Sequence, residues 1–358
     1  MTAPAHSPAW QERGHSRSLG KLLDERSRGS DNNFLALRLL AALAVVVGHS
    51  FPLAPTPCLG CKDILREAGS PVPLHGMGVL IFFAISGFLI LRSATQHRLI
   101  DFARARVLRI LPGLAICAVV MALVIGPLYS AYSFTEYLTR SEPYSYIFRI
   151  VTFARYVPFG LPGVVFTATA NGSTVNGSLW TIPLEVRLYV LAALAGLSIR
   201  HLRIPGLVTI GILTLLSGWT DLSFIVPNED DYRLAWMFAI GASMYTARRW
   251  IPMHALICIG LIVSWRVCRE TAAGPALFNV MVAYSTLYVA FLPAMRMPTY
   301  VKDYSYGIYL YAFPLQQVIS HMLPSIGPYG LMALSLPLSC LAGVLSWKLI
   351  EEKALRWK

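Results

Sequence analysis

The sequence predicts an all-α polytopic membrane protein with about ten transmembrane helices and both termini in the cytoplasm. The first observation behind this is composition: 56% of the 358 residues are hydrophobic, only 13% are charged, and the mean hydropathy is +0.57. Soluble domains carry charge on about a quarter of their residues, so a large soluble core is excluded. The second observation is that basic residues gather in short loops between apolar segments, as cytoplasmic loops do.

The net charge of +12 does not indicate nucleic-acid binding. The cations lie in the short loops, and no RNA- or DNA-binding motif accompanies them. Membrane lipid is therefore the expected partner of this charge, and no nucleic acid is expected.

Stretches that are long and apolar enough to be membrane helices recur along the whole chain. Several are short or contain proline, which leaves their boundaries approximate. They cover residues 33–52, 76–94, 107–129, 179–199, 204–220, 232–247, 252–268, 275–295, 304–323 and 328–350.

The charge of the loops sets the orientation. Residues 1–32 form a basic, polar tail without the apolar core and cleavage site of a signal peptide. With this tail in the cytoplasm, every inner loop is net basic and the acidic run at 228–231 lies outside. We therefore expect a transmembrane domain over residues 33–351 and a cytoplasmic tail over residues 352–358.

The segment 130–178 is too long for a simple connection and is expected outside the membrane or re-entering it. It is rich in tyrosine and phenylalanine. Such residues commonly form an interfacial belt at the membrane surface. A stacking surface for a sugar is the alternative.

Six cysteines are spread along the chain, and two of them are close together. Cys58 and Cys61 form a C-x-x-C in the first outer loop, where a local disulfide is the plain interpretation. A redox motif lacks its usual βαβ context, and zinc would need a second pair of ligands. No metal site is expected.

The most informative stretch runs from Arg38 to His49, because it is apolar except for these two residues. Eleven residues make about three helical turns, so both side chains share one face about 16 Å apart along the axis. Ala42 and Val45, on the same face, are small enough to leave a groove. Ionisable groups inside a membrane span usually face a bundle interior or a water-filled path, which makes both candidates for function. Histidine can act as a base near neutral pH.

A cluster of arginines stands at the cytoplasmic start of the third span. Arg106 and Arg109 are one turn apart and share a face with several donors, which suits phosphate groups. Arg104 lies just before them. An ordinary lipid-binding anchor on the positive side of the membrane is the alternative.

Glu185 lies in the fourth span, about 8 Å below Trp180, at the depth expected for His49. A carboxylate there could orient the imidazole and stabilise its charge. A structural ion pair, for example with Arg187, is equally compatible with the sequence. Tyr189 follows one turn after Glu185.

Five segments, in order, resemble the acyltransferase-3 family of bacterial membrane O-acyltransferases, which act on O-antigen, exopolysaccharide and Nod factors. The resemblance extends from about residue 33 to the C-terminus. Each motif is weak alone, but their order is specific. They are Arg38–His49 with its ten-residue spacing, Gly78–Leu89, Leu179–Tyr189, Tyr304–Tyr311 and Ser346–Glu351.

The resemblance implies an enzyme of the bacterial inner membrane that moves an acyl group, most often acetyl from acetyl-CoA, to a hydroxyl of a cell-surface or exported carbohydrate. By position, His49 would be the catalytic histidine and Arg38 its essential partner. Whether His49 would act as base or carry the acyl group stays open, with the base slightly preferred.

The resemblance also implies roles for residues around this pair. Ser86 and Glu185 would line the pathway. Arg104 and Arg106, with Arg109 beside them, would bind the coenzyme, and Trp180 and Tyr189 would contact the acceptor.

The chain departs from the family pattern in two places. Ala312 replaces a frequent histidine, which removes any role for a histidine there. Glu351, Glu352 and Lys353 replace a frequent Glu-Lys-Pro, which we expect to affect only a terminal cap.

A transporter or flippase is the alternative from another class. In it Arg38, His49 and Glu185 would relay a proton or a substrate. Inverted repeats with broken helices would support this interpretation, and the sequence has none that we can detect.

Overall fold

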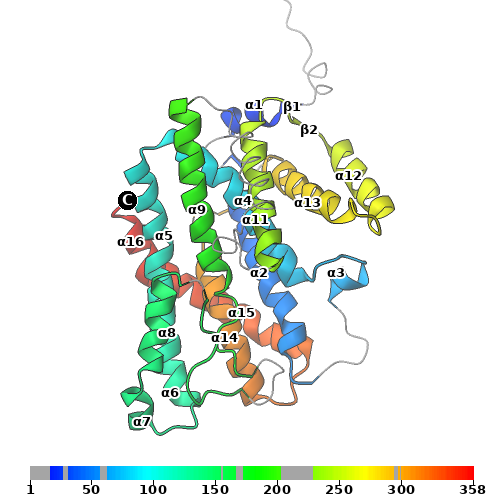
Figure 1. Ribbon diagram of the computed structural model, residues 1–358. Helices are drawn as coiled ribbons and strands as arrows, with labels where there is room; N and C mark the ends of the chain where they lie inside the picture. The colour runs from blue at the N-terminus through cyan, green and yellow to red at the C-terminus, as the bar shows by residue number, and fades with distance from the viewer. Residues whose placement is uncertain are drawn as a thin grey trace, which may run out of the picture.

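The computed structural model describes most of the chain and is almost entirely helical (Figure 1). Two strands of two residues each, β1 (Arg17–Ser18) and β2 (Pro252–Met253), pair antiparallel beside the bundle. The described residues are 17–26, 31–56, 63–154, 156–166, 172–202, 229–293, 297–298 and 300–358.

The first half of the chain contributes three long helices and several short ones. They are α1 (Leu19–Glu25), α2 (Phe34–Leu53), α3 (Ile64–Glu67), α4 (Leu74–Gln96), α5 (Leu99–Val120), the π-helical turn η2 (Met121–Ile125), α6 (Gly126–Tyr129), α7 (Phe134–Thr139) and α8 (Glu142–Val151).

The second half contributes the remaining described helices. They are α9 (Thr181–Leu197), η3 (Ser198–Leu202), α11 (Glu229–Thr246), α12 (Ala255–Cys268), α13 (Gly274–Ala290), α14 (Ser305–Met322), α15 (Pro328–Ser346), η5 (Trp347–Glu351) and α16 (Glu352–Leu355).

The predicted fold class is confirmed, because these helices form a polytopic membrane protein. Five helices among the described residues are long and apolar enough to cross a membrane, and two shorter apolar helices, α12 and α13, accompany them. Two further expected spans are helical as α11 and α14, which carry more polar residues. The expected span 204–220 lies outside the described residues, as do Cys58 and Cys61. The five long segments are Phe34–Leu53, Leu74–Gln96, Leu99–Tyr129, Thr181–His201 and Pro328–Leu355.

The third span begins at Leu99, earlier than the expected residue 107. The apolar pattern starts late because the arginines occupy the first turns, yet they are part of the helix. The segment 130–178 also differs from a loop, since its helix α8 runs beside α5 (Figure 1). Tyr146 and Ile150 of α8 are buried in the main core, and the Tyr137 hydroxyl donates to the Ala122 carbonyl oxygen at 2.9 Å. Some of its aromatic residues are therefore core residues.

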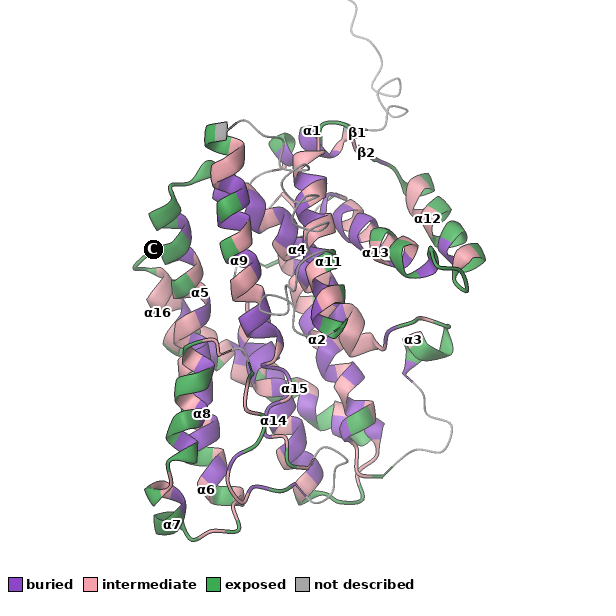
Figure 2. Ribbon diagram, in the orientation of Figure 1, coloured by how far each residue is buried: buried purple, intermediate pink, exposed green. Residues whose placement is uncertain are grey.

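Buried residues concentrate where α2, α4, α9, α11 and α14 face one another, whereas α12 is largely exposed (Figure 2). The backbones of α4 and α11 approach each other closely at two glycines. A Cβ atom at Gly87 would collide with the Phe238 carbonyl, and one at Gly241 would collide with the Ala84 carbonyl. Small residues at both positions allow the backbones to approach, as is common between membrane helices.

Gly241→Leu should lower the thermal stability of the detergent-solubilised protein, because the new side chain forces α11 away from α4. Overpacking of this kind costs about 1–3 kcal/mol. Gly260→Leu is the matched control, since no atom lies within 4 Å of a Cβ at that position of α12. Equal melting temperatures for the two variants would contradict the close α4–α11 contact.

Candidate functional site

Two neighbouring cavities lie along α2. The inner cavity, on the side of Arg38, has a volume of about 50 Å³ and is lined by α2, α4, α9 and α14. The outer cavity, on the side of His49, has a volume of about 300 Å³. Val79 and Tyr309 line both, so the two cavities share a wall made by these side chains.

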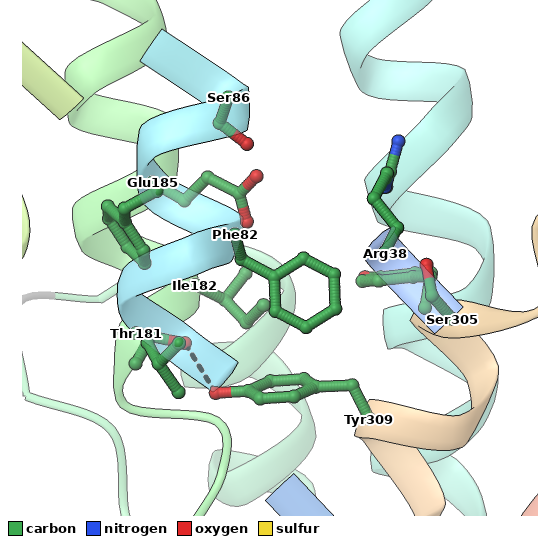
Figure 3. A pocket seen from close by; sticks show the side chains of 11 residues that line it. Arg38, Phe82, Ser86, Thr181, Ile182, Glu185, Ser305 and Tyr309 are labelled. Atoms are coloured by element: carbon green, nitrogen blue, oxygen red, sulfur yellow. Dashed lines mark hydrogen bonds between the residues drawn. The ribbon is translucent and has the colours of Figure 1, made fainter. Parts of the chain in front are cut away.

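The inner cavity places a cation opposite a carboxylate (Figure 3). Arg38 lies on one side and Glu185 on the other, with Ser86 lining the same space. Tyr189 donates its hydroxyl to the Glu185 carboxylate. Tyr309 is held by Thr181, whose hydroxyl oxygen lies 2.7 Å away.

A series of linked ion pairs holds the Arg38 side chain in place. The Arg38 guanidinium lies 3.0 Å from the Asp303 carboxylate, and Arg109 contacts the same carboxylate at 2.8 Å. Arg109 also pairs with Glu351 at 2.9 Å, and the Glu351 side chain is only 1% exposed. Ser346 donates to the other Glu351 oxygen at 2.9 Å. Four charged groups from α2, α5, η5 and the segment before α14 thus form one network.

Asp303 lies outside the membrane-spanning helices. Burial disfavours its charged form, but the guanidinium groups of Arg38 and Arg109 together outweigh burial and lower the pKa of Asp303 below its usual value. The carboxylate therefore stays ionised between the two arginines.

The three arginines of α5 take different positions. Arg106 is half-buried and interacts electrostatically with Tyr189 and Glu185, and its buried Nε has no hydrogen-bond partner among the described residues. Arg109 is occupied by its two carboxylates. Arg104 is exposed, because residues two apart on a helix point in different directions. The arginine pair that the resemblance implies is therefore not a pair in space, whereas Arg106 and Arg109 do both face inward.

The outer cavity contains two imidazoles in contact. His49 stacks on His75 of α4 with ring centroids 4.5 Å apart and an interplanar angle of 20°. Phe313 of α14 also contacts His49, in a T-shaped arrangement with ring centroids 5.4 Å apart. The Nδ1 atoms of both histidines are buried and lack a hydrogen-bond partner within the described part of the chain. A Cβ at Gly48 would collide with the His75 backbone, so this glycine permits the contact.

The structure brings together most of the predicted site residues, in two groups. His49 and Trp180 line the outer cavity, and Arg38, Ser86 and Glu185 line the inner cavity.

Three expectations about position are corrected. Glu185 does not face His49, because it lines the inner cavity and accepts its hydrogen bond from Tyr189. Tyr189 accordingly lies beside Glu185 and Arg106 and not with Trp180. The groove expected along Ala42 and Val45 is filled: both are fully buried, Ala42 in a cluster with α14 and Val45 against Gly78 of α4.

Sequence reasoning missed three residues of the site. His75 lies three positions before the segment with the family pattern, at the start of α4, where it resembled a boundary residue. Asp303 immediately precedes the Tyr304–Tyr311 motif and was overlooked as a loop residue. Glu351 was treated as part of a terminal cap, although it is almost fully buried in the ion-pair network. A signal was available for Asp303 and Glu351, since each adjoins or belongs to a quoted motif.

The described residues contain no group of three or more histidine, cysteine, aspartate or glutamate side chains that could hold a metal ion. The chemistry that the cavities can support uses a neutral imidazole as base or nucleophile, with guanidinium groups to bind anions.

Comparison with known proteins identifies one protein family and two similar full-length proteins. Residues 32–349 match the acyltransferase domain family. An O-acetyl transferase of Shigella phage Sf6 is 29% identical, over 90% of this chain and 96% of the relative. Nodulation protein 10 of Rhizobium leguminosarum bv. viciae is 28% identical, over 93% of this chain and 95% of the relative. No solved structure matches the chain significantly.

Glu351→Gln should destabilise the protein, because it leaves the Arg109 charge with one carboxylate instead of two in a buried position. Removing one partner of a buried ion pair costs about 3 kcal/mol. The neighbouring Glu352→Gln is the control, since Glu352 is 45% exposed and contacts Arg356 only at 3.7 Å. Thermal unfolding in detergent should separate the two variants clearly, and similar melting temperatures would contradict the network.

Proposed function

The chain belongs to the acyltransferase domain family, and we propose that it is a membrane O-acyltransferase that moves an acyl group from cytoplasmic acyl-CoA to a hydroxyl of a carbohydrate outside the bilayer. Acetyl is the acyl group we expect, in keeping with the name of the phage relative. The bacterial inner membrane is the expected location, with both termini in the cytoplasm, because the loops assigned to that side are net basic.

One observation carries the proposal: Arg38 and His49 line adjacent cavities that share a wall. The thioester arm of the donor would enter from the side of Arg38 and reach the imidazole of His49 past Val79 and Tyr309. The inner cavity, at about 50 Å³, is too small for the arm at rest. The wall residues must therefore move when the donor enters.

The donor's phosphates would bind at the cytoplasmic start of α5. Arg106 is the strongest candidate, because its Nε has no partner among the described side chains while it lies close to the inner cavity. Arg104 is exposed and would add a weaker contact, because water and salt screen it more strongly. Arg109 would act indirectly, by holding Asp303 and so Arg38 in place.

His49 would serve as general base. Its ring takes the proton of the acceptor hydroxyl while the oxygen attacks the thioester carbonyl carbon. The new carbon–oxygen bond forms, the carbon–sulfur bond breaks, and the coenzyme thiolate receives the proton from the imidazolium. The products are the O-acyl carbohydrate and the free thiol of the coenzyme. Trp180, at the outer cavity, offers the flat apolar surface against which a sugar ring can pack.

His49→Ala should abolish transfer of label from [¹⁴C]acetyl-CoA to the surface polysaccharide, because the base is lost. Loss of a general base lowers the rate by about 10²–10⁴-fold. His97→Ala is the control, since His97 is exposed at the end of α4. Both proteins must be present in the membrane in equal amounts, and retained transfer in His49→Ala would remove His49 from the chemistry.

Arg106→Ala should weaken the binding of labelled acetyl-CoA by about tenfold or more, because hydrogen bonds to charged groups contribute about 1.5–3 kcal/mol. Arg104→Ala should weaken it less, because an exposed ion pair contributes at most about 1 kcal/mol. Arg149→Ala, an exposed arginine of α8, is the control. Unchanged binding in Arg106→Ala would restore lipid anchoring as the role of these arginines.

A further inference from the structure

The contact between His49 and His75 has a geometry that ordinary packing does not require. The two rings are stacked at 4.5 Å and nearly parallel, and they come from different helices that approach at Gly48. Both rings line the outer cavity, and neither Nδ1 has a hydrogen-bond partner among the described residues. A buried ring nitrogen without a partner is costly unless it serves a ligand or a proton.

The charges around the pair balance. Arg66 of α3 and Arg233 of α11 line the outer cavity with Asp230 of α11. Asp63 caps the start of α4 by accepting the Leu74 backbone N–H at 2.8 Å. From α14, the groups that face the pair are Phe313 and the hydroxyl-bearing Tyr309. These neighbours supply two cations and two anions, so their net charge neither favours nor opposes a proton on the pair.

We propose that His75 is a positioning residue for His49 and that the two stacked imidazoles hold no more than one proton between them during acyl transfer. The proposal rests on the proposed role of His49 as base. When His49 takes the proton of the acceptor hydroxyl, its ring becomes an imidazolium that lies over the face of the neutral His75 ring. A cation over an aromatic face within about 6 Å is stabilised by the ring. The proton then leaves His49 for the coenzyme thiolate, and both rings return to the neutral state.

The same contact strongly disfavours a proton on both rings at once. Two unit charges 4.5 Å apart, at an effective dielectric constant of about 20, weaken the second proton's binding by about a hundredfold or more. A proton that arrives first on His75 therefore prevents His49 from accepting the hydroxyl proton. Transfer requires both rings to be neutral, and either ring can stop it by binding a proton.

This coupling gives two opposite pH signatures. In the wild type, activity falls on the acid side when either ring is protonated, whereas in His75→Phe only His49 remains to be protonated. The acid limb of the rate should therefore move to lower pH in His75→Phe, by about 0.3 unit if the rings bind the proton equally and by more if His75 binds it better. The pH at which the His49 ring loses its reactivity should shift in the opposite direction, to higher pH, in His75→Phe. A proton on His75 keeps His49 neutral in the wild type, and His75→Phe removes that protection.

The experiment uses the full-length protein purified in detergent, with acetyl-CoA and extracted surface polysaccharide. It follows release of the free coenzyme thiol from about pH 3 to about pH 9, a range that extends well below the one in which an exposed histidine titrates, because both rings are buried. His49 carbethoxylation by diethyl pyrocarbonate, which attacks neutral imidazole, is measured over the same range by peptide mass spectrometry. The variants are His75→Phe, which keeps an aromatic ring, and His75→Ala, which removes it. His97→Phe is the control.

The expected result is an acid limb of activity at lower pH and a loss of His49 modification at higher pH in His75→Phe. His75→Ala should lower kcat by about tenfold with an unchanged KM for acetyl-CoA, which a general folding defect would not do. If His75→Phe is too slow for a rate profile, the His49 modification profile decides alone. Coincident wild-type and His75→Phe profiles would overturn the limit of one proton, and a wild-type kcat in His75→Ala would overturn the positioning role. Retained transfer in His49→Ala would instead overturn the proposed function itself, so the two failures are distinguishable.

Discussion

The carboxylate of Asp303, held between the guanidinium groups of Arg38 and Arg109, is the interaction on which the inner half of the molecule depends. Charges inside a membrane protein are stable only when partners surround them. Asp303 is the partner of a cation on α2 and of another on α5. Glu351 adds a second carboxylate for the cation on α5 and so joins the end of the long C-terminal helix to the network. The network fixes the depth and rotation of α2, and these in turn fix where His49 meets α4.

Close helix contacts, and not charge, place α4 in the bundle. Gly48 and Gly78 allow α4 to approach α2, and Gly87 allows it to approach α11. Helix α4 therefore passes through the centre of the bundle and lends side chains to both cavities. The ion-pair network and the close contacts of α4 together hold a cation and an imidazole at opposite ends of α2.

Much of this arrangement was predictable from the sequence, because membrane helices obey simple rules of length and apolarity. The spacing of Arg38 and His49 placed both on one side of α2. The resemblance implied that Ser86 and Glu185 line a pathway, and the structure places both at the inner cavity. The depth of Glu185 relative to His49 was wrong, because depth along a helix depends on how far each helix is shifted against its neighbour. His75 was missed for a related reason: one sequence shows no pairing between helices, so a stacking partner is invisible until the helices are placed. The prediction of a groove along Ala42 and Val45 was wrong, because small residues allow a neighbouring helix to pack closely just as they leave room for a ligand.

Tyr309 is anchored by two short hydrogen bonds, one shared with the Thr181 hydroxyl and one donated to the Ser178 carbonyl oxygen, both at 2.7 Å. An enzyme that passes a thioester through a bilayer must also keep protons and ions from leaking down the membrane potential. Soluble transferases have no such requirement. An anchored phenol in the wall between the inner and the outer cavity interrupts any continuous file of water between them. If the donor passes from one cavity to the other as proposed, the side chain that blocks leakage is also the one that must move for turnover, so permeability and turnover would be linked.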